Sequence, residues 1–273
     1  MTGLALKKIR AGFFSGEIQA SYDHPRLLQA LAQLPELTRS GEAEIILESR
    51  NRLVALNLPL NEAEEREVVV KEFRPRGVAK LREFFTGSKA KRSFYGALIL
   101  IRRKIPTPEP IGYLEGNLPG QGKVGYYLSL RLKGVEEIRF LWRRRPSEAL
   151  RPLLEQLASF LRSLHWQGVW HRDLSDGNIL VKLKSPGCFE FFLLDTNRLR
   201  LRKKVGRWRA VKNLIRLGIP FSEQTFFLQK YLGSSSVPFP LWLWYRLSKI
   251  AYTNWVQIKK KLRLRTLARR LGG

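Results

Sequence analysis

His-Arg-Asp-Leu-Ser-Asp-Gly-Asn, residues 171–178, followed by the apolar run Ile-Leu-Val, residues 179–181, is the part of the chain most indicative of its fold. Asp173 offers a carboxylate that can orient and deprotonate a hydroxyl group, and Asn178 offers an amide oxygen that can hold Mg²⁺. The two lie five positions apart on one predicted tight loop. Such a pairing suits phosphoryl transfer, which depends on positioning and charge neutralisation.

This spacing matches the H-R-D-L-x-x-x-N catalytic loop of protein kinases at each defined position. Residues 179–183 and 189–194 read as two strands joined by the turn Lys-Ser-Pro-Gly, residues 184–187. The hairpin would return the chain to Asp195, beside Asn178, and Asp195 is therefore the predicted second metal ligand. The alternative is that Asp173 and Asp195 are ordinary turn residues, and five matched motif positions argue against it.

Lys71 is the predicted phosphate-binding lysine. It follows Val-Val-Val, residues 68–70, and so parallels the V-A-I-K signature of a kinase strand whose lysine holds the α- and β-phosphates. Taken alone, Lys71 would be an exposed strand lysine with a snorkelling stem. The catalytic loop downstream favours the kinase interpretation, because kinases place the two parts in this order.

The predicted elements follow the order of a two-lobed, α+β kinase-like fold, with a small antiparallel-sheet N-lobe and a mainly helical C-lobe. Strands are expected at residues 43–47, 52–58, 67–73, 111–115 and 124–132, and helices at 88–103, with Ser88 as N-cap, and at 147–167. We expect an N-terminal extension over residues 1–43, the N-lobe over 44–133 with a hinge at Lys133-Gly134, and the C-lobe with basic C-terminal helices over 134–273.

Composition sets limits on the class of protein. The chain has 273 residues, and 50 Lys and Arg against 23 Asp and Glu give a net charge of +27 and a pI near 10.8. A single cysteine, Cys188, cannot form an internal disulfide, which fits a reducing cytoplasm. No segment has the long apolar run of a signal peptide or a membrane-spanning helix.

The positive charge is concentrated after the catalytic loop, where 19 Lys and Arg stand against one acid, Glu223, from Arg198 onward. Apolar residues recur there at helical steps: Trp244, Leu247, Ala251, Trp255, Ile258 and Leu262. A basic amphipathic helix of this kind can lie on an anionic membrane surface. The alternative is that this stripe belongs to the last core helix of the C-lobe.

Five motifs together resemble the bacterial lipopolysaccharide kinase family, which phosphorylates Kdo or heptose in the inner core. They are Val-Val-Lys-Glu-Phe (69–73), Ser-Lys-Ala-Lys-Arg (88–92), Ile-Pro-Thr-Pro (105–108), the 171–180 block and Leu-Asp-Thr-Asn-Arg (194–198). The resemblance implies ATP and Mg²⁺ as cofactors, a lipid-linked anionic sugar as acceptor, and a peripheral location on the cytoplasmic face of the inner membrane. It also implies that Asp173 is the base, Asn178 and Asp195 the metal ligands, Lys71 the phosphate lysine, and Arg198 a structural or phosphate-facing cation.

Several kinase features are missing from the sequence. Glu-Ser-Arg-Asn-Arg, residues 48–52, stands where a glycine-rich loop would cover the phosphates, and the helix 88–103 contains no acid to pair with Lys71. Glu83 is the nearest upstream candidate for that pairing. Asp-Thr-Asn replaces Asp-Phe-Gly at residues 195–197 and no Ala-Pro-Glu follows, which argues against a phosphorylated activation loop and a protein substrate.

Three other classes of protein are compatible with parts of this pattern. A kinase-like nucleic-acid binder could use the net charge for phosphate contacts and Trp208 for stacking on a base. A pseudokinase scaffold would explain the missing glycine loop, although Lys71, Asp173, Asn178 and Asp195 form a complete catalytic set. A small-molecule kinase for cationic substrates would need an acidic cleft, and this chain has the opposite charge.

Overall fold

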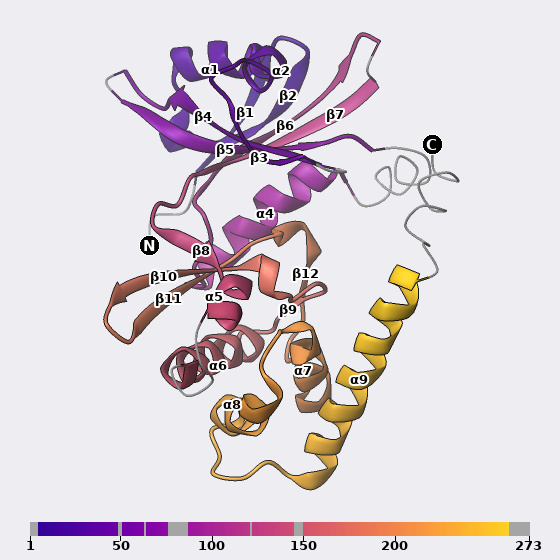
Figure 1. Cartoon of the computed structure of the whole chain (residues 1–273). Helices are drawn as coiled ribbons and strands as arrows, with labels where there is room; N and C mark the ends of the chain where they lie inside the picture. The colour runs from indigo at the N-terminus through magenta and orange to yellow at the C-terminus, as the bar shows by residue number, and fades with distance from the viewer. Residues whose placement is uncertain are drawn as a thin grey trace. The chain divides into compact units, whose positions relative to one another are not determined.

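The computed structural model describes residues 5–48, 51–62, 64–75, 87–120, 122–144 and 150–261. The chain divides into two units, one of Met1–Arg102 with Thr107–Leu132 and one of Arg103–Pro106 with Lys133–Gly273. An antiparallel sheet organises the first unit and helices predominate in the second, as the kinase-like interpretation predicts (Figure 1). No helix among the described residues is long and apolar enough to span a bilayer.

The first unit is built on one seven-stranded antiparallel sheet with the order β1-β2-β6-β7-β5-β4-β3. Its strands are β1 (Leu6–Ala11), β2 (Phe14–Gln19), β3 (Glu44–Glu48), β4 (Arg52–Pro59), β5 (Glu65–Phe73), β6 (Pro110–Leu118) and β7 (Gly122–Leu130). The structure differs here from the expected extension over residues 1–43, because β1 and β2 extend the same sheet beside β6. Their alternating pattern is short and interrupted by Gly12 and Gly16, so sequence periodicity is weak there.

Helices pack on both faces of this sheet. On one face lies α1 (Pro25–Ala32), between η1 (Ala20–Tyr22) and α2 (Leu34–Leu37) in the chain. Leu27 and Leu31 of α1 join a buried cluster with Val70 of β5. On the other face Phe94 of α4 (Lys89–Arg102) packs with Phe73 of β5. Side chains alternate along a strand, so Lys71 lies on the α4 face, with Phe73.

Helix α4 begins and ends where its sequence predicts. The Ser88 hydroxyl accepts a hydrogen bond from the Lys91 amide (3.0 Å), which satisfies one of the free N–H groups of the first turn. After Arg102 the chain turns at Lys104, whose φ is 55°, and Pro106 prevents further helical hydrogen bonding. Helix α4 carries no acidic residue, so it offers Lys71 no carboxylate partner.

The second unit surrounds α6 (Arg151–Trp166), whose leucines at 153, 154, 157, 161 and 164 are fully buried. Helix α8 (Gln224–Leu232) packs against α6. The unit also contains α5 (Ile138–Arg144), α7 (Arg207–Asn213), α9 (Phe239–Lys261) and the short turns η3 (Asp176–Asn178), η4 (Thr196–Arg198), η5 (Leu214–Arg216) and η6 (Phe221–Glu223). Residues 147–149 of the expected helix 147–167 lie outside the described residues. The period of buried leucines explains why this helix is recognisable from sequence.

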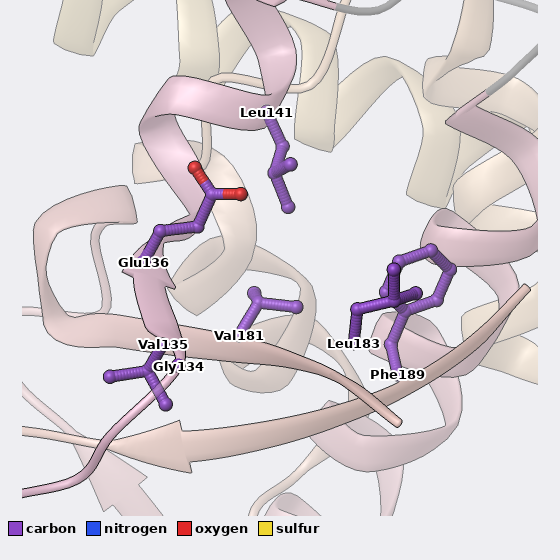
Figure 2. Close-up of a pocket in the computed structure, with 7 residues that line it drawn as sticks. All are labelled: Gly134, Val135, Glu136, Leu141, Val181, Leu183 and Phe189. Atoms are coloured by element: carbon purple, nitrogen blue, oxygen red, sulfur yellow. The ribbon is translucent and has the colours of Figure 1, made fainter. Parts of the chain in front are cut away.

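The predicted hairpin is present as β10 (Ile179–Ser185) and β11 (Cys188–Leu193), and β8 (Val135–Glu137) pairs with β10 to complete a three-stranded sheet. One face of this sheet borders a cavity of about 230 Å³ between β8, α5 and the hairpin (Figure 2). Its lining is mainly apolar: Gly134, Val135, Glu136, Leu141, Val181, Leu183 and Phe189. None of the predicted site residues lines this cavity, so the chemistry belongs elsewhere in the unit.

Candidate active site

The catalytic loop is held at its start by a two-stranded ladder. Strand β9 (Val169–His171) pairs antiparallel with β12 (Leu199–Leu201), with His171 opposite Leu199. Gly168, just before β9, has a φ of 71°, and its carbonyl accepts a hydrogen bond from the Arg202 amide (2.9 Å). The ladder therefore fixes the segment before Asp173 against the segment after Asp195.

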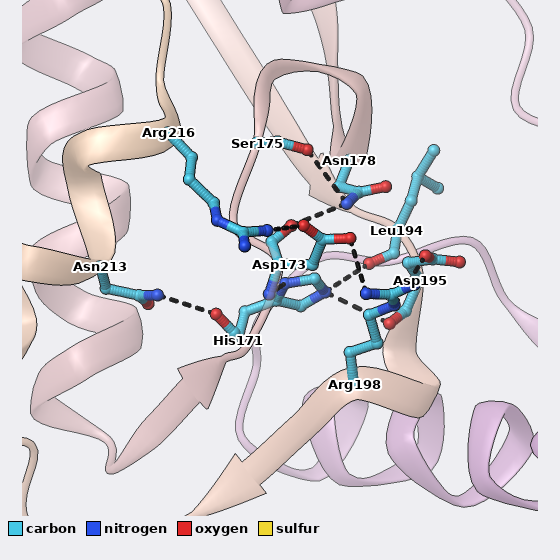
Figure 3. Close-up of polar contacts among 9 residues, drawn as sticks. All are labelled: His171, Asp173, Ser175, Asn178, Leu194, Asp195, Arg198, Asn213 and Arg216. Atoms are coloured by element: carbon cyan, nitrogen blue, oxygen red, sulfur yellow. Dashed lines mark hydrogen bonds and ion pairs between the residues drawn. The ribbon is translucent and has the colours of Figure 1, made fainter. Parts of the chain in front are cut away.

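His171 fastens the loop to the predicted metal-binding segment. Its Nδ1 accepts the Asp173 amide hydrogen (3.1 Å), so Nε2 must carry the ring proton, which it donates toward the carbonyls of Leu194 (3.1 Å) and Asp195 (3.2 Å) (Figure 3). The ring is fully buried, and this burial lowers the pKa of His171 to about 4. His171 is therefore a neutral, positioning residue.

Two arginines hold the Asp173 carboxylate from separate elements. Arg198 Nη1 of η4 pairs with Oδ2 (2.9 Å), and Arg216 Nη1 of η5 bonds to Oδ1 (Figure 3). Arg198 Nε also lies 3.5 Å from Asp195 Oδ2, so one guanidinium bridges the two aspartates. These pairs orient the carboxylate and balance the negative charge that two nearby aspartates would otherwise concentrate.

Asn178 and Asp195 lie on either side of the hairpin and present oxygen atoms beside Asp173. The Asn178 amide nitrogen donates to the Asp173 carbonyl (2.7 Å) and to Ser175 Oγ (3.2 Å), so its amide oxygen is the atom left for a cation. The Asn178 carbonyl accepts the Leu194 amide hydrogen (2.9 Å), which ties the two ends of the hairpin together. Asp195 itself adopts the left-handed conformation, with φ 55° and ψ 43°.

Behind the loop, a buried chain of hydrogen bonds reaches from α8 to His171. The Tyr231 hydroxyl lies 2.6 Å from His165 Nδ1, and His165 Nε2 lies 3.0 Å from Asn213 Oδ1. The Asn213 amide nitrogen then donates to the His171 carbonyl (2.8 Å). Burial lowers the pKa of His165 to about 4, so the ring is neutral and donates from Nε2. Three helices thereby set the position of the catalytic loop through one satisfied network.

The loop that carries Arg216 is fixed by two further contacts. The Asp176 carboxylate accepts the Gly218 amide hydrogen at both oxygens (2.8 and 2.9 Å). The Lys249 ammonium group of α9 donates to the carbonyls of Ile215 (3.3 Å) and Leu217 (2.6 Å), on both sides of Arg216. Asp176 of the catalytic loop and Lys249 of the last helix therefore hold the same short segment.

Of the predicted site residues, the structure brings Asp173, Asn178 and Asp195 together in the second unit. Lys71 belongs to the first unit, where it is half-buried on β5 and its ammonium group lies 5.6 Å from the centre of the Phe73 ring. Glu83, the suggested partner of Lys71, lies outside the described residues, as do residues 49–50 of the segment that replaces the glycine-rich loop. The role of Lys71 therefore stays a prediction.

Sequence reasoning missed Arg216 and Asn213, and it identified neither partner of His165. Arg216 bonds to Asp173 across 43 positions of sequence, in a segment where arginine and lysine are frequent, so no local signal separates it from its neighbours. Asn213 and His165 are recognisable as functional partners only when α6 and α7 are packed together. Polar residues within otherwise apolar helical faces are the one signal that could have pointed to them.

Comparisons with known proteins bear on the family and the fold. The model of the Lipopolysaccharide kinase (Kdo/WaaP) family matches residues 102–231, which include the catalytic loop, the hairpin, Asp195 and Arg216 but not Lys71. A solved structure of WaaP in complex with acyl carrier protein resembles the chain with a TM-score of 0.53 and 20% sequence identity, over 77% of this chain and 88% of that chain. No curated protein matches the sequence.

The structural likeness supports the two-lobed kinase-like fold that the sequence predicted. The family match covers the segment in which Asp173, Asn178 and Asp195 meet. The predicted resemblance is thereby confirmed: residues 102–231 match the model of the Lipopolysaccharide kinase (Kdo/WaaP) family.

Proposed function

We propose that this protein transfers the γ-phosphoryl group of ATP to a sugar hydroxyl, of Kdo or heptose, in the inner core of lipopolysaccharide. The observation that carries the proposal is the meeting of the Asp173 carboxylate, the Asn178 amide and the Asp195 carboxylate around one guanidinium and one neutral histidine. A base beside two oxygen ligands is the minimum that a phosphoryl-transfer site needs from the protein.

The residues at this site fit Mg²⁺. Asn178 and Asp195 are hard oxygen donors, and Mg²⁺ is commonly held by one or two protein oxygens together with phosphate oxygens of the nucleotide. Among the described residues, no three His, Cys, Asp or Glu side chains lie close enough together to hold a metal ion by themselves. Bound Mg²⁺ would neutralise the charge that develops on the phosphates.

Asp173 is the proposed base. As the acceptor oxygen bonds to the γ-phosphorus and the bond from that phosphorus to the bridging oxygen of ADP breaks, the hydroxyl proton passes to the Asp173 carboxylate. Arg198 and Arg216 orient this carboxylate. His171 fixes the backbone of the site, because it accepts the Asp173 amide hydrogen and donates to the Asp195 carbonyl. Lys71 is the proposed ligand of the α- and β-phosphates, by its place after the Val-Val-Val run of β5.

The acceptor is proposed to be anionic and lipid-linked, and the protein to work peripherally at the cytoplasmic face of the inner membrane. A net charge of +27 favours binding to such an acceptor and to an anionic bilayer. The missing activation-loop motifs support a sugar rather than a protein as substrate.

The test is phosphate transfer from Mg-ATP to Kdo-lipid A and to a heptose-containing core acceptor. Asp173→Asn should lower kcat by about 10²–10⁴-fold, the usual contribution of a general base. Glu155→Gln is the matched control, because Glu155 is an exposed carboxylate paired with Lys230 (2.7 Å) on α8. Equal activity of Asp173→Asn and the wild type would exclude Asp173 as the base, and phosphorylation of neither acceptor would exclude the proposed substrate class.

A further inference from the structure

The last helix, α9, exposes an apolar face. Leu247, Ile250, Trp255 and Ile258 are 57%, 50%, 51% and 47% exposed, and they recur at three- to five-residue steps along the helix. Phe239, Leu243 and Trp244 extend the same face toward the start of α9, where the exposed Trp208 of α7 lies with its ring against Trp244 (6.2 Å between centroids). We call these eight residues the α9 face.

The α9 face contacts the lobe at its start, where Trp244 Nε1 donates to the Trp208 carbonyl (3.3 Å), and the rest of the face lies away from the buried side of the helix. Leu241 and Tyr245 are buried on the opposite side of α9, and Lys249 bonds to the two carbonyls of the η5 segment. Figure 1 shows α9, in yellow, running beside α7 along the edge of this unit. The helix therefore has a packed inner side and a second apolar side that meets solvent, whereas an ordinary core helix has one apolar stripe.

Charge favours one occupant for this face. The chain contains no acidic residue after Glu223, and α9 carries Arg246, Lys249 and the Lys-Lys-Lys run of residues 259–261. Tryptophan is enriched at the boundary between lipid headgroups and acyl chains, and each basic residue near an anionic leaflet adds about 1 kcal/mol of attraction. A second copy of a chain with a net charge of +27 would be repelled, and aliphatic side chains offer nothing to a nucleic-acid backbone.

We propose that the α9 face inserts into the headgroup boundary of an anionic bilayer and seats the protein there. The helix lies in the plane of the surface, with its aliphatic and tryptophan side chains buried and its basic residues against lipid phosphates. The choice of bilayer rests on the proposed function, because a lipid-linked acceptor is found only there.

The same helix contacts Arg216, which orients the proposed base. Arg216, which bonds to Asp173, lies with its guanidinium 5.2 Å from the centre of the Tyr252 ring on the inner side of α9. Lys249 holds the backbone on both sides of Arg216. Membrane seating through α9 therefore places the loop that orients the base close to the surface from which the acceptor sugar projects.

The experiment measures binding to vesicles by co-sedimentation and needs no catalysis. The full chain is mixed with vesicles of phosphatidylglycerol and phosphatidylcholine, and with vesicles of phosphatidylcholine alone. Leu247→Gln combined with Ile258→Gln should weaken binding to the anionic vesicles at least about tenfold, since two apolar side chains no longer leave water. Binding of the wild type should also fall as NaCl is raised.

Phe13→Gln combined with Trp166→Gln is the matched control, because these side chains are 68% and 85% exposed and lie outside α9. This control should bind vesicles as the wild type does. Equal binding by the α9 variant, or no binding by the wild type, would overturn the proposal. The proposal would also be overturned if the wild type did not bind vesicles but formed a dimer in sedimentation velocity, or a complex with RNA, that the α9 variant loses and the control keeps.

Transfer to a soluble core sugar separates this proposal from the proposed kinase function. The α9 variant should keep its rate with the soluble acceptor and lose rate with the acceptor embedded in vesicles. Failure of transfer to both acceptors by the wild type, with vesicle binding intact, would count against the kinase function and leave the membrane surface standing.

Discussion

At the scale of single residues, Asp195 combines a proposed metal ligand with an uncommon backbone conformation. A φ of 55° is costly for most side chains, whereas aspartate and asparagine tolerate it because they bond locally to the backbone. In this conformation the Asp195 carbonyl faces His171 Nε2 and its carboxylate faces Arg198. The residue type is therefore suited both to the turn and to the chemistry.

We expect Asp195→Asn to keep the fold and lose metal binding. Asparagine fits the left-handed conformation, and the half-exposed Arg198 pair contributes little, so the free energy of unfolding should change by less than about 0.5 kcal/mol. The Mg²⁺ concentration needed for half-maximal transfer should rise more than about tenfold. Loss of a residue that only hydrogen-bonds to a metal ligand already lowers metal affinity by about tenfold or more, and Asp195 is proposed to be a ligand itself. A magnesium titration of activity and a urea melt measure the two effects. An unchanged Mg²⁺ requirement would remove Asp195 from the metal site.

At the scale of elements, the ladder of β9 and β12 depends on Gly168. A Cβ atom at this position would lie 2.0 Å from the Arg202 carbonyl oxygen, and the φ of 71° adds backbone strain. Strand β9, which leads into the catalytic loop, therefore has no room for a side chain at position 168, just before its first residue.

Gly168→Ala should destabilise the protein by about 2 kcal/mol or more, since β9 must move away from β12. The control is Gly41→Ala, where a Cβ atom meets nothing within 4 Å and the backbone is not left-handed. Thermal melts of both variants give the comparison. Equal stability of the two variants would show that β9 and β12 can move apart to accept the added methyl group at little cost in free energy.

At the scale of the whole molecule, stability should depend on two buried neutral histidines. Burial lowers the pKa of His165 and of His171 from 6.5 to about 4. Between these pH values the unfolded chain binds more protons than the folded one, so the free energy of unfolding falls as the pH is lowered through that window. Each histidine contributes up to about 3 kcal/mol to this loss.

Urea unfolding at several pH values between 6.5 and 4 tests this expectation. His165→Gln should flatten the pH dependence by roughly the share of one histidine. Tyr231→Phe removes the hydroxyl that bonds to His165 but keeps the titrating ring, so stability should fall while a pH dependence from His165 remains. An unchanged slope in His165→Gln would mean that this ring is not neutral in the fold.

The catalytic loop, the hairpin and the leucine-rich helix could be predicted from sequence because each is a local pattern. A short hairpin brings together Asp173, Asn178 and Asp195. Hairpins can be predicted from sequence, because turn residues and strand periodicity indicate them. The strands β1 and β2 could not be assigned to the sheet in this way, since their place beside β6 is a pairing between distant segments.

The class of fold, the proposed base and metal ligands, and the excess of positive charge toward the C-terminal end could all be read from the sequence. Only the tertiary structure decided that Arg198 and Arg216 hold Asp173, that a buried network from Tyr231 to His171 sets the loop, and that α9 has a second, exposed apolar face. The motif residues lie on one loop and at the two ends of a short hairpin, so local sequence brings them together. Ion pairs, buried networks and exposed faces depend instead on which distant elements pack together.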